Sequence, residues 1–196
     1  MNNKQALLDQ IRADIVKNNI CPDLAKTANQ LVFGSGNINA EVVFIGEAPG
    51  KKEDETGEPF VGASGKLLDQ LLESIHFQRS NIYITNIVKY RPPENRDPST
   101  AEKEAFLPYL FKQLAVISPK VVVTLGRHSA NCFLPRLVIG KEHGQPKEVE
   151  SVVDGKALKL NILPLYHPAA ALYNGGLRKT LQEDFAVIPQ LIRNTN

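Results

Sequence analysis

Residues 42–50 read Val-Val-Phe-Ile-Gly-Glu-Ala-Pro-Gly, an apolar run that passes directly into a turn with two glycines, a proline and one carboxylate. The apolar half predicts a buried β-strand. Glycines allow backbone N–H groups to approach a ligand closely, and the proline fixes the turn. Because ligands of open α/β sheets bind beyond the carboxyl ends of the strands, we expect a ligand-binding turn here.

Two later segments supply side chains for such a site. Phe60 lies in Pro-Phe-Val-Gly at residues 59–62, and His167 lies in Tyr-His-Pro-Ala-Ala at residues 166–170, after another apolar run. Asn86 follows a second apolar run, and its amide can donate and accept hydrogen bonds at once. A backbone turn, an aromatic ring, a histidine and an amide together predict a pocket for a flat polar ring. The glycines that flank Phe60 favour its exposure.

Hydrophobic spacing and turn residues place the elements around this pocket. The expected helices cover residues 3–17, from near 64, from 99 to about 117, and 177–193; the expected strands cover 41–45, 82–88, 121–125 and 162–165, with a hairpin at 149–160. Residues 46–63 are expected to form a long functional loop, and Pro164 argues for a sheet edge or an early strand end. Near-continuous apolar strands suit a parallel sheet covered on both faces. We predict a three-layer α/β/α sandwich with a mostly parallel, four-stranded central sheet.

Length and composition limit the class of protein. A chain of 196 residues with 42% hydrophobic and 22% charged residues predicts a single globular domain over residues 1–196. A net charge of +2 does not by itself indicate nucleic acid, and two distant cysteines give no disulfide framework. There is no apolar run of about 20 residues and no signal-peptide pattern. We expect a soluble, cytoplasmic, monomeric protein with no membrane partner.

The motifs occur in an order that resembles the family-four uracil-DNA glycosylases, which implies a protein of bacterial or archaeal type. They are Gly46–Asp54, Gly57–Leu68, Thr85–Lys89 with Arg91–Arg96, Pro119–Val121 with Leu125-Gly126, and Tyr166–Ala169. The resemblance runs from about residue 20 to the last helix. It implies a uracil-DNA glycosylase-like fold and a monofunctional enzyme that flips uracil out of DNA. The enzyme would cleave the glycosidic bond and leave an abasic site in base-excision repair.

The resemblance assigns roles to the pocket residues. Phe60 would stack on the flipped base, and Asn86 would read O4 and N3–H of uracil while rejecting cytosine. His167 would stabilise the uracil anion that develops at O2. Glu47, Glu53 and Asn95 match catalytic positions that hold the base, the sugar or the water, with their individual roles open. The substrate-binding turn contains Gly46, Ala48 and Gly50, and Ala48 stands where family-one enzymes have a water-positioning aspartate.

DNA contacts are expected from two segments and one helix start. Apolar side chains after His167 would insert into the duplex, and cations would bind phosphates. The helix that begins near Ser64 could add backbone N–H groups. The expected DNA-binding residues are Ser64, Lys89, Arg91, Arg96, Leu172 and Arg178. The histidines His76, His128 and His143 are interpreted as surface or helix positions.

The chain departs from the family at its cofactor. Family-four enzymes typically hold a 4Fe–4S cluster on four cysteines. Tyr90 and Phe106 stand at two of those positions, Cys21 matches one of an N-terminal pair whose other member is missing, and Cys132 lies where no ligand is expected. We therefore predict no cluster and no other metal, with the two rings filling the space.

Three other interpretations stay open at this point. One is a non-enzymatic DNA-binding or regulatory descendant of the fold, which the loss of the cysteines makes credible. Another is a glycosylase for a different deaminated base, such as hypoxanthine or xanthine. The third is a nucleotide-binding α/β protein, although the chain lacks a dinucleotide fingerprint and the Gly-Lys-Ser/Thr of a phosphate loop.

Overall fold

The computed structural model describes residues 3–195. Its elements are, in chain order, α1 (Asn3–Lys17), α2 (Pro22–Thr27), β1 (Ser35–Gly36), β2 (Val42–Gly46), α3 (Lys51–Thr56), α4 (Ala63–Ser74), η1 (Arg79–Asn81), β3 (Tyr83–Asn86), η2 (Pro93–Asn95), α5 (Thr100–Ile117), β4 (Val121–Leu125), α6 (Arg127–Asn131), α7 (Ile139–Glu142), β5 (Lys147–Val153), β6 (Lys156–Leu165), α8 (Pro168–Ala171), α9 (Gly175–Phe185) and α10 (Ile188–Asn194), where η1 and η2 are 3₁₀ turns. Among residues 3–195, no helix is both long and apolar enough to cross a bilayer.

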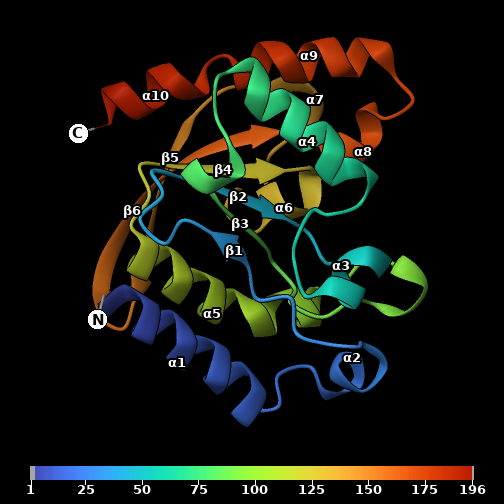
Figure 1. The fold of residues 1–196 in the computed structure, drawn as a ribbon. Coiled ribbons are helices and arrows are strands. Elements are labelled where there is room, and N and C mark those ends of the chain that lie inside the picture. Colours follow the sequence, from blue (N-terminus) through green and yellow to red (C-terminus); the bar gives the residue numbers. More distant parts are fainter. Residues whose placement is uncertain (1–2, 196) are drawn as a thin grey trace.

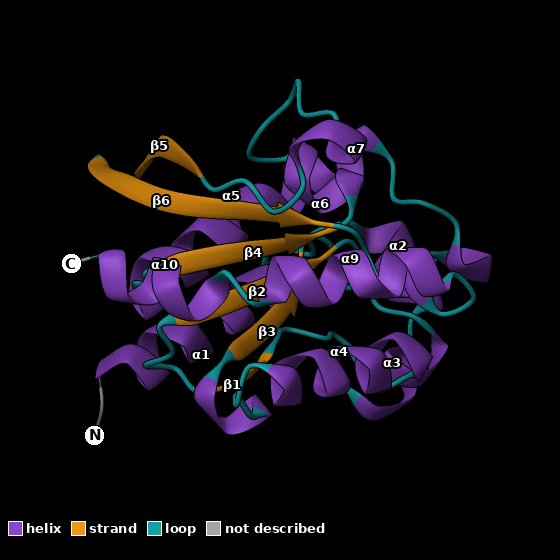
Figure 2. Cartoon of the chain, turned by 90° about the horizontal axis from the view of Figure 1, so that it is seen from above, coloured by secondary structure: helices purple, strands orange, loops and turns teal. Residues whose placement is uncertain are grey.

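The sheet has six strands in the order β1-β3-β2-β4-β6-β5. Its inner four strands, β3, β2, β4 and β6, are parallel, as the sequence predicts, and they point the same way in Figure 2. The short β1 pairs antiparallel with β3 at one edge, and β5 pairs antiparallel with β6 at the other. The predicted hairpin and the predicted strand at 162–165 share a single long strand, β6.

Pro164 lies at a local edge of the sheet. The β5–β6 pairing reaches only as far as Lys147 opposite Ile162, whereas Pro164 pairs with Thr124 on β4. Beyond Ile162, β6 therefore has β4 as its one strand neighbour, and the missing N–H of Pro164 interrupts no ladder with β5. The edge that the proline indicates is confirmed locally.

Helices cover both faces of the sheet (Figure 1). Helices α1 and α5 pack on one face, where they meet Val43 and Ile45 of β2. Helices α4, α9 and α10 pack on the other face, where they meet Val42 and Phe44. Alternate side chains of the fully buried strand β2 thus enter two separate cores, one on each face of the sheet. This arrangement is the three-layer sandwich that the apolar runs predict.

Two predicted segments differ from the structure. Helix α3 lies inside the predicted loop 46–63, because its sequence Lys-Lys-Glu-Asp-Glu-Thr has no apolar periodicity to reveal it. The predicted helix 177–193 is divided into α9 and α10 at Ala186-Val187. Pro189 lies in the first turn of α10 and has no N–H to donate to the carbonyl of Phe185, where α9 ends.

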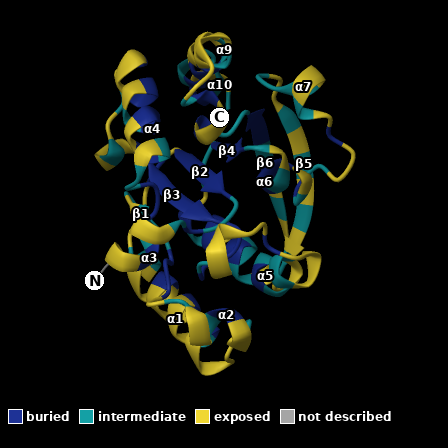
Figure 3. Cartoon of the chain, turned by 90° about the vertical axis from the view of Figure 1, so that its right-hand side faces the viewer, coloured by how far each residue is buried: buried dark blue, intermediate teal, exposed yellow. Residues whose placement is uncertain are grey.

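The central strands are buried along their length, whereas β5 alternates between partly buried and exposed residues (Figure 3). Because β2, β3, β4 and β6 are parallel, their carboxyl ends meet at one edge of the sheet. This edge carries the residues that the sequence singles out.

Candidate active site

Gly46 and Asn86 lie opposite each other at the ends of β2 and β3. A Cβ atom on Gly46 would collide with Oδ1 of Asn86 and would lie 2.7 Å from Cε2 of Phe60. Glycine is therefore required at this strand end, because the amide and the aromatic ring occupy the space of a side chain. We call these three residues the base pocket, because the sequence predicts that a flat polar ring binds here.

The Asn86 side chain is buried and incompletely hydrogen-bonded. Asn86 is 2% exposed, and its Oδ1 has no hydrogen-bond partner among residues 3–195. A buried acceptor without a donor costs about 1–3 kcal/mol. An N–H group of a ligand in the base pocket would supply the missing donor.

Phe60 is held by its backbone as well as by its ring. It adopts a left-handed conformation with φ of 55°. Arg79 donates to the carbonyl of Pro59 at 3.2 Å and also to that of Phe60, and it pairs with Asp69 at 2.6 Å. The flanking glycines predicted exposure, and this was wrong, since Phe60 is 6% exposed. The reason is that Gly65 lets the first turn of α4 close onto the Phe60 carbonyl, where any Cβ would collide.

Glu53 fixes the loop that presents Phe60. Its Oε1 accepts hydrogen bonds from the N–H groups of Val61 and Gly62, at 2.9 and 2.8 Å. A Cβ on Gly50, the N-cap of α3, would lie 2.7 Å from Oε2 of Glu53. The carboxylate therefore ties the turn after β2 to the Phe60 loop.

His167 follows β6 and faces Phe60. The two rings stack with centroids 5.7 Å apart and planes at 29°. Nδ1 accepts a hydrogen bond from the Ala169 N–H at 3.1 Å, and burial lowers the pKa of His167 to about 4. The imidazole is therefore neutral at pH 7, and its proton lies on Nε2. It is a neutral hydrogen-bond donor next to the base pocket.

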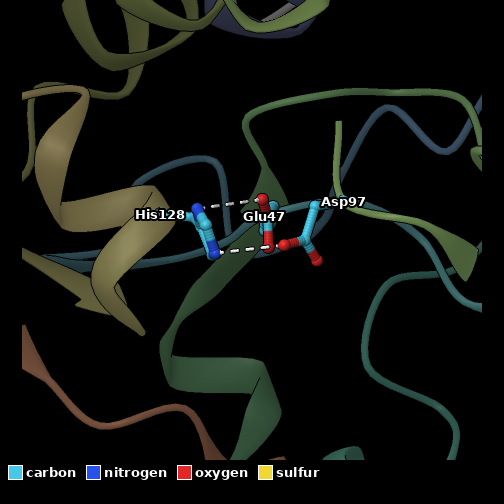
Figure 4. A group of neighbouring side chains, drawn as sticks. All are labelled: Glu47, Asp97 and His128. Carbon is cyan, nitrogen blue, oxygen red and sulfur yellow. Dashed lines mark ion pairs between the residues drawn. The ribbon is translucent and has the colours of Figure 1, made fainter. Parts of the chain in front are cut away.

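A cavity of about 250 Å³ adjoins His167, and Glu47 and His128 lie on its wall. Burial, and secondarily Asp97, raises the pKa of Glu47 to about 7. Its Oε1 is buried and has no hydrogen-bond partner within the described part of the chain. Figure 4 shows the His128 ring on one side, facing both carboxylates, with Nδ1 3.6 Å from Glu47 and Nε2 3.4 Å from Asp97.

No role in the site was predicted for His128, which was interpreted as a surface or helix position. It lies on α6, as expected of a helix position, but it also faces the cavity. The available signal was its place just after Leu125-Gly126, at the end of a buried strand. Donor atoms of Glu47, Asp97 and His128 lie within 4.8 Å of one another, a spacing that also suits a metal ion. However, Arg127 donates from Nε to Nε2 of His128 at 3.2 Å, and this neighbouring cation favours a hydrogen-bonded group over a metal site.

The predicted DNA-binding cations have different surroundings. Lys89 is fully buried, and its Nζ donates to Thr85 Oγ1 at 2.6 Å and to the Asn86 carbonyl at 2.8 Å. This position corrects the expectation of a phosphate contact, because the amine has no access to solvent and supports the strand end below Asn86. Arg96 forms a two-pronged contact with Glu102, at 2.6 and 2.8 Å, beside the start of α5.

Arg91 and Asn95 contact each other in the loop before α5, with Nε of Arg91 donating to Oδ1 of Asn95 at 2.8 Å. Asn95 is exposed there and does not line the cavity of Glu47. Ala48 packs against the core on the α5 face. The structure thus brings Gly46, Phe60, Asn86 and His167 together, with Glu47 across the adjoining cavity.

The segment after His167, from which apolar side chains were predicted to enter the duplex, contains an exposed aromatic residue. Leu172, the predicted wedge, is partly buried against the core on the α4 face, whereas the adjacent Tyr173 is 98% exposed. Asn174 caps α9 by accepting from the Leu177 N–H at 3.1 Å. Arg178 is exposed and donates to Gln70 on α4 at 2.6 Å. Ser64 lies in the first turn of α4.

The residues of this chain do not fit a 4Fe–4S cluster. The chain has two cysteines in all, Cys21 and Cys132, and both are free thiols, whereas such a cluster takes four thiolates. Tyr90 and Phe106 are buried and pack edge-to-face with centroids 6.0 Å apart. Cys21 packs against the same core, and burial and Glu102 raise its pKa, which disfavours the thiolate.

Comparison with known proteins agrees with this arrangement. The sequence model of the uracil DNA glycosylase superfamily matches residues 33–188. A type-4 uracil-DNA glycosylase of Archaeoglobus fulgidus is 47% identical over 94% of this chain and 92% of its own length. Those of Sulfurisphaera tokodaii and Thermotoga maritima are 43% and 34% identical, over 94% and 98% of this chain and 84% and 98% of their own lengths. The chain belongs to the uracil DNA glycosylase superfamily.

Proposed function

We propose that this protein is a monofunctional uracil-DNA glycosylase of the type-4 kind, which hydrolyses the N-glycosidic bond of deoxyuridine in DNA and leaves an abasic site. The observation that carries the proposal is the base pocket. Asn86 holds a buried, unpaired Oδ1 against Phe60, and Gly46 leaves room for both. Relatives at high coverage that are named type-4 uracil-DNA glycosylases support the substrate.

The amide of Asn86 suits the Watson–Crick edge of uracil. Oδ1 accepts from N3–H, and the amide N–H₂ donates to O4. Cytosine has no proton on N3 and carries an amino group at C4, so both contacts fail and the buried groups stay unpaired. Hypoxanthine offers the same adjacent N–H and C=O pair on a larger ring, so the size of the pocket separates it from uracil.

Bond cleavage leaves negative charge on the uracil, which His167 stabilises. As a neutral imidazole it donates from Nε2 to O2 and needs no prior deprotonation. Glu47 is a carboxylate above its pKa of about 7 and borders the same cavity, so it is placed to orient the water that attacks the sugar. Lys89 is buried behind Asn86, which leaves it without access to the sugar for a lyase reaction.

The surface around Tyr173 is the proposed duplex contact. Tyr173 enters the base stack as the uracil flips out, while Arg178 and the N-terminal turn of α4 at Ser64 approach the phosphates. Leu172 acts below them as the apolar anchor of the loop. Arg91 and Arg96 line the loop before α5, where each already has a protein partner.

The enzyme proposed here works without an iron–sulfur cluster, as the two-cysteine count and the Tyr90–Phe106 pair support. The single domain, the monomeric state and the cytoplasmic location stay predictions from the sequence.

The test is cleavage of a labelled oligonucleotide that carries one uracil, with alkali added after the reaction. Wild-type protein is expected to give alkali-dependent cleavage, and His167→Ala to lose it while still binding the same DNA. DNA binding without cleavage by the wild type would instead identify a non-enzymatic descendant. Cleavage of a hypoxanthine oligonucleotide alone would change the substrate.

A further inference from the structure

His128 offers a donor to the unpaired oxygen of Glu47. Its Nδ1 lies 3.6 Å from Glu47 Oε1, within about half an ångström of hydrogen-bond length. Its Nε2 accepts from the Nε–H of Arg127 at 3.2 Å. Because Nε2 is already an acceptor, the proton of the neutral ring lies on Nδ1 and points at Glu47 (Figure 4).

The backbone around His128 is built to hold this orientation. Gly126, with φ of 91°, turns β4 into α6, and a Cβ there would lie 3.1 Å from Cβ of His167. Buried Ser129 donates to the carbonyls of Leu125 and Gly126, at 2.8 and 3.0 Å, and so ties α6 to the strand end. The same glycine therefore brings His128 and His167 to one cavity.

We propose that His128 is a positioning residue for uracil excision: its Nδ1–H holds the Glu47 carboxylate toward the cavity that both share with His167. This inference rests on the proposed function, because it assigns His128 a role in that reaction. The neutral ring stabilises the ionised form of Glu47, which is the form that orients water. Asp97 opposes it, since its negative charge favours protonated Glu47.

The charge balance around the pair favours a neutral His128. Its pKa is lowered, first by burial and then by nearby cations, while Asp97 raises it. The ionisable groups that face Glu47 and His128 are Asp97 before α5, Lys103 on α5, Arg127 on α6, Cys132 just after α6, and His167 across the cavity. Lys103 and Arg127 lower the pKa of Glu47 through their charges, whereas His128 brings a ring nitrogen to 3.6 Å from its buried Oε1.

The experiment is single-turnover excision of uracil between pH 5 and 9 by wild type, His128→Leu, His128→Asn and Asp97→Asn. Loss of the donor is expected to move the acid limb of the His128→Leu profile up by about one pH unit. The rate at pH 6 then falls by about tenfold and the rate at pH 9 is unchanged. His128→Asn keeps a donor near Nδ1 and stays close to wild type, whereas Asp97→Asn moves the limb to lower pH.

A carbon NMR titration of the Glu47 carboxyl, without DNA, measures the same shifts in the pKa of Glu47 independently of catalysis. Shifts in the titration without any excision by wild type would overturn the proposed function but not the Glu47–His128 contact. An unchanged Glu47 titration in His128→Leu would overturn the inference. So would an equal, pH-independent loss of rate in His128→Leu and His128→Asn, or an acid limb that moves with added Mn²⁺ or a chelator. If His128→Leu does not fold, the other two variants test the inference. It then requires an acid limb at lower pH in Asp97→Asn and a wild-type pH profile in His128→Asn.

Discussion

Different single residues of the site are assigned to recognition of the base and to stabilisation of charge. Asn86 provides a buried acceptor and donor for the base, and His167 provides a neutral donor for the leaving group. Glu47 titrates near neutrality, because it is buried and faces Asp97. The roles of the three side chains can therefore be tested by three different measurements.

Replacement of His167 by alanine is expected to lower the rate of uracil excision by about 100- to 1,000-fold, the usual effect of one donor to a developing anion. Affinity for uracil-containing DNA should change little, because the donor acts on charge that forms during cleavage. Single-turnover rates and a binding titration on the same variant measure both. Equal losses of rate and affinity would contradict the role of His167.

Replacement of Asn86 by aspartate is expected to reduce the preference for uracil over cytosine by about tenfold or more, since a carboxyl group has no N–H to offer O4. Asn39→Asp is the matched control, because Asn39 is exposed at the amino-terminal side of β2. Rates on uracil and cytosine oligonucleotides give the ratio. An unchanged ratio in Asn86→Asp would remove Asn86 from base reading.

The pH profile of the wild type is expected to fall on the acid side near pH 7, with Glu47 and not His167 as the titrating group. The sign follows from their pKa values: Glu47 loses its charge as the pH drops below about 7, whereas His167 stays neutral down to about 4. Glu47→Gln should lower the rate and flatten this limb. A limb that persists in Glu47→Gln would assign it to another group.

Helices and loops position these residues, and the start of α5 shows how. Ser99 and Glu102 form a capping box, and Arg96 completes it from the loop before the helix. The Arg96 contact, together with the Ser99 bonds, lowers the pKa of Glu102 to about 2. The capping box was predicted from the sequence, because it depends on local spacing alone.

Glu102→Gln is expected to reduce the free energy of unfolding at pH 7 by roughly 0.5 to 1 kcal/mol, since Arg96 is open to solvent. The folded pKa of Glu102 lies below the unfolded value near 4.5, so its contribution is present above that value and fades as the pH falls toward 2. Urea unfolding at pH 7 and pH 3, with Glu104→Gln as the exposed control on the same helix, measures the difference. An identical loss at both pH values would rule out the ion pair as its source.

The loop between α8 and α9 carries the next prediction. Tyr173→Ala is expected to slow excision from a duplex by about tenfold, because an inserted side chain offsets the cost of unstacking, while excision from a single strand is little affected. Val152→Ala is a control, since Val152 is also exposed but lies on β5. Equal effects on both substrates would argue against insertion.

At the scale of the whole molecule, elements that depend on local sequence could be predicted, whereas contacts between distant segments could not. Four parallel strands, the hairpin and the α5 cap follow from periodicity and local spacing. Helix α3 does not, because its sequence has no apolar periodicity. The burial of Phe60 and of Lys89 and the facing of His128 toward Glu47 do not either, because they depend on residues that only the fold brings together. Lys89 is the clearest case: its surroundings in sequence suggest a surface cation, while its amine is bonded inside the protein.

At this scale Phe106 and Tyr90 are expected to act as core residues. Phe106→Ala should lower the free energy of unfolding by about 3–5 kcal/mol, because it leaves a cavity in the core on the α5 face. Chemical denaturation of the purified variant measures this. Little loss of stability would show that the two rings do not support the fold where the family's cluster is expected.

The most direct measurement is the release of free base by purified wild-type protein from oligonucleotides that carry one uracil, one hypoxanthine or one cytosine, with iron measured on the same preparation. We expect free uracil, little hypoxanthine or cytosine, and iron far below four atoms per chain. Release of no uracil, under conditions in which the protein is folded and binds the DNA, would contradict the proposal that the base pocket of Gly46, Phe60 and Asn86 serves uracil excision.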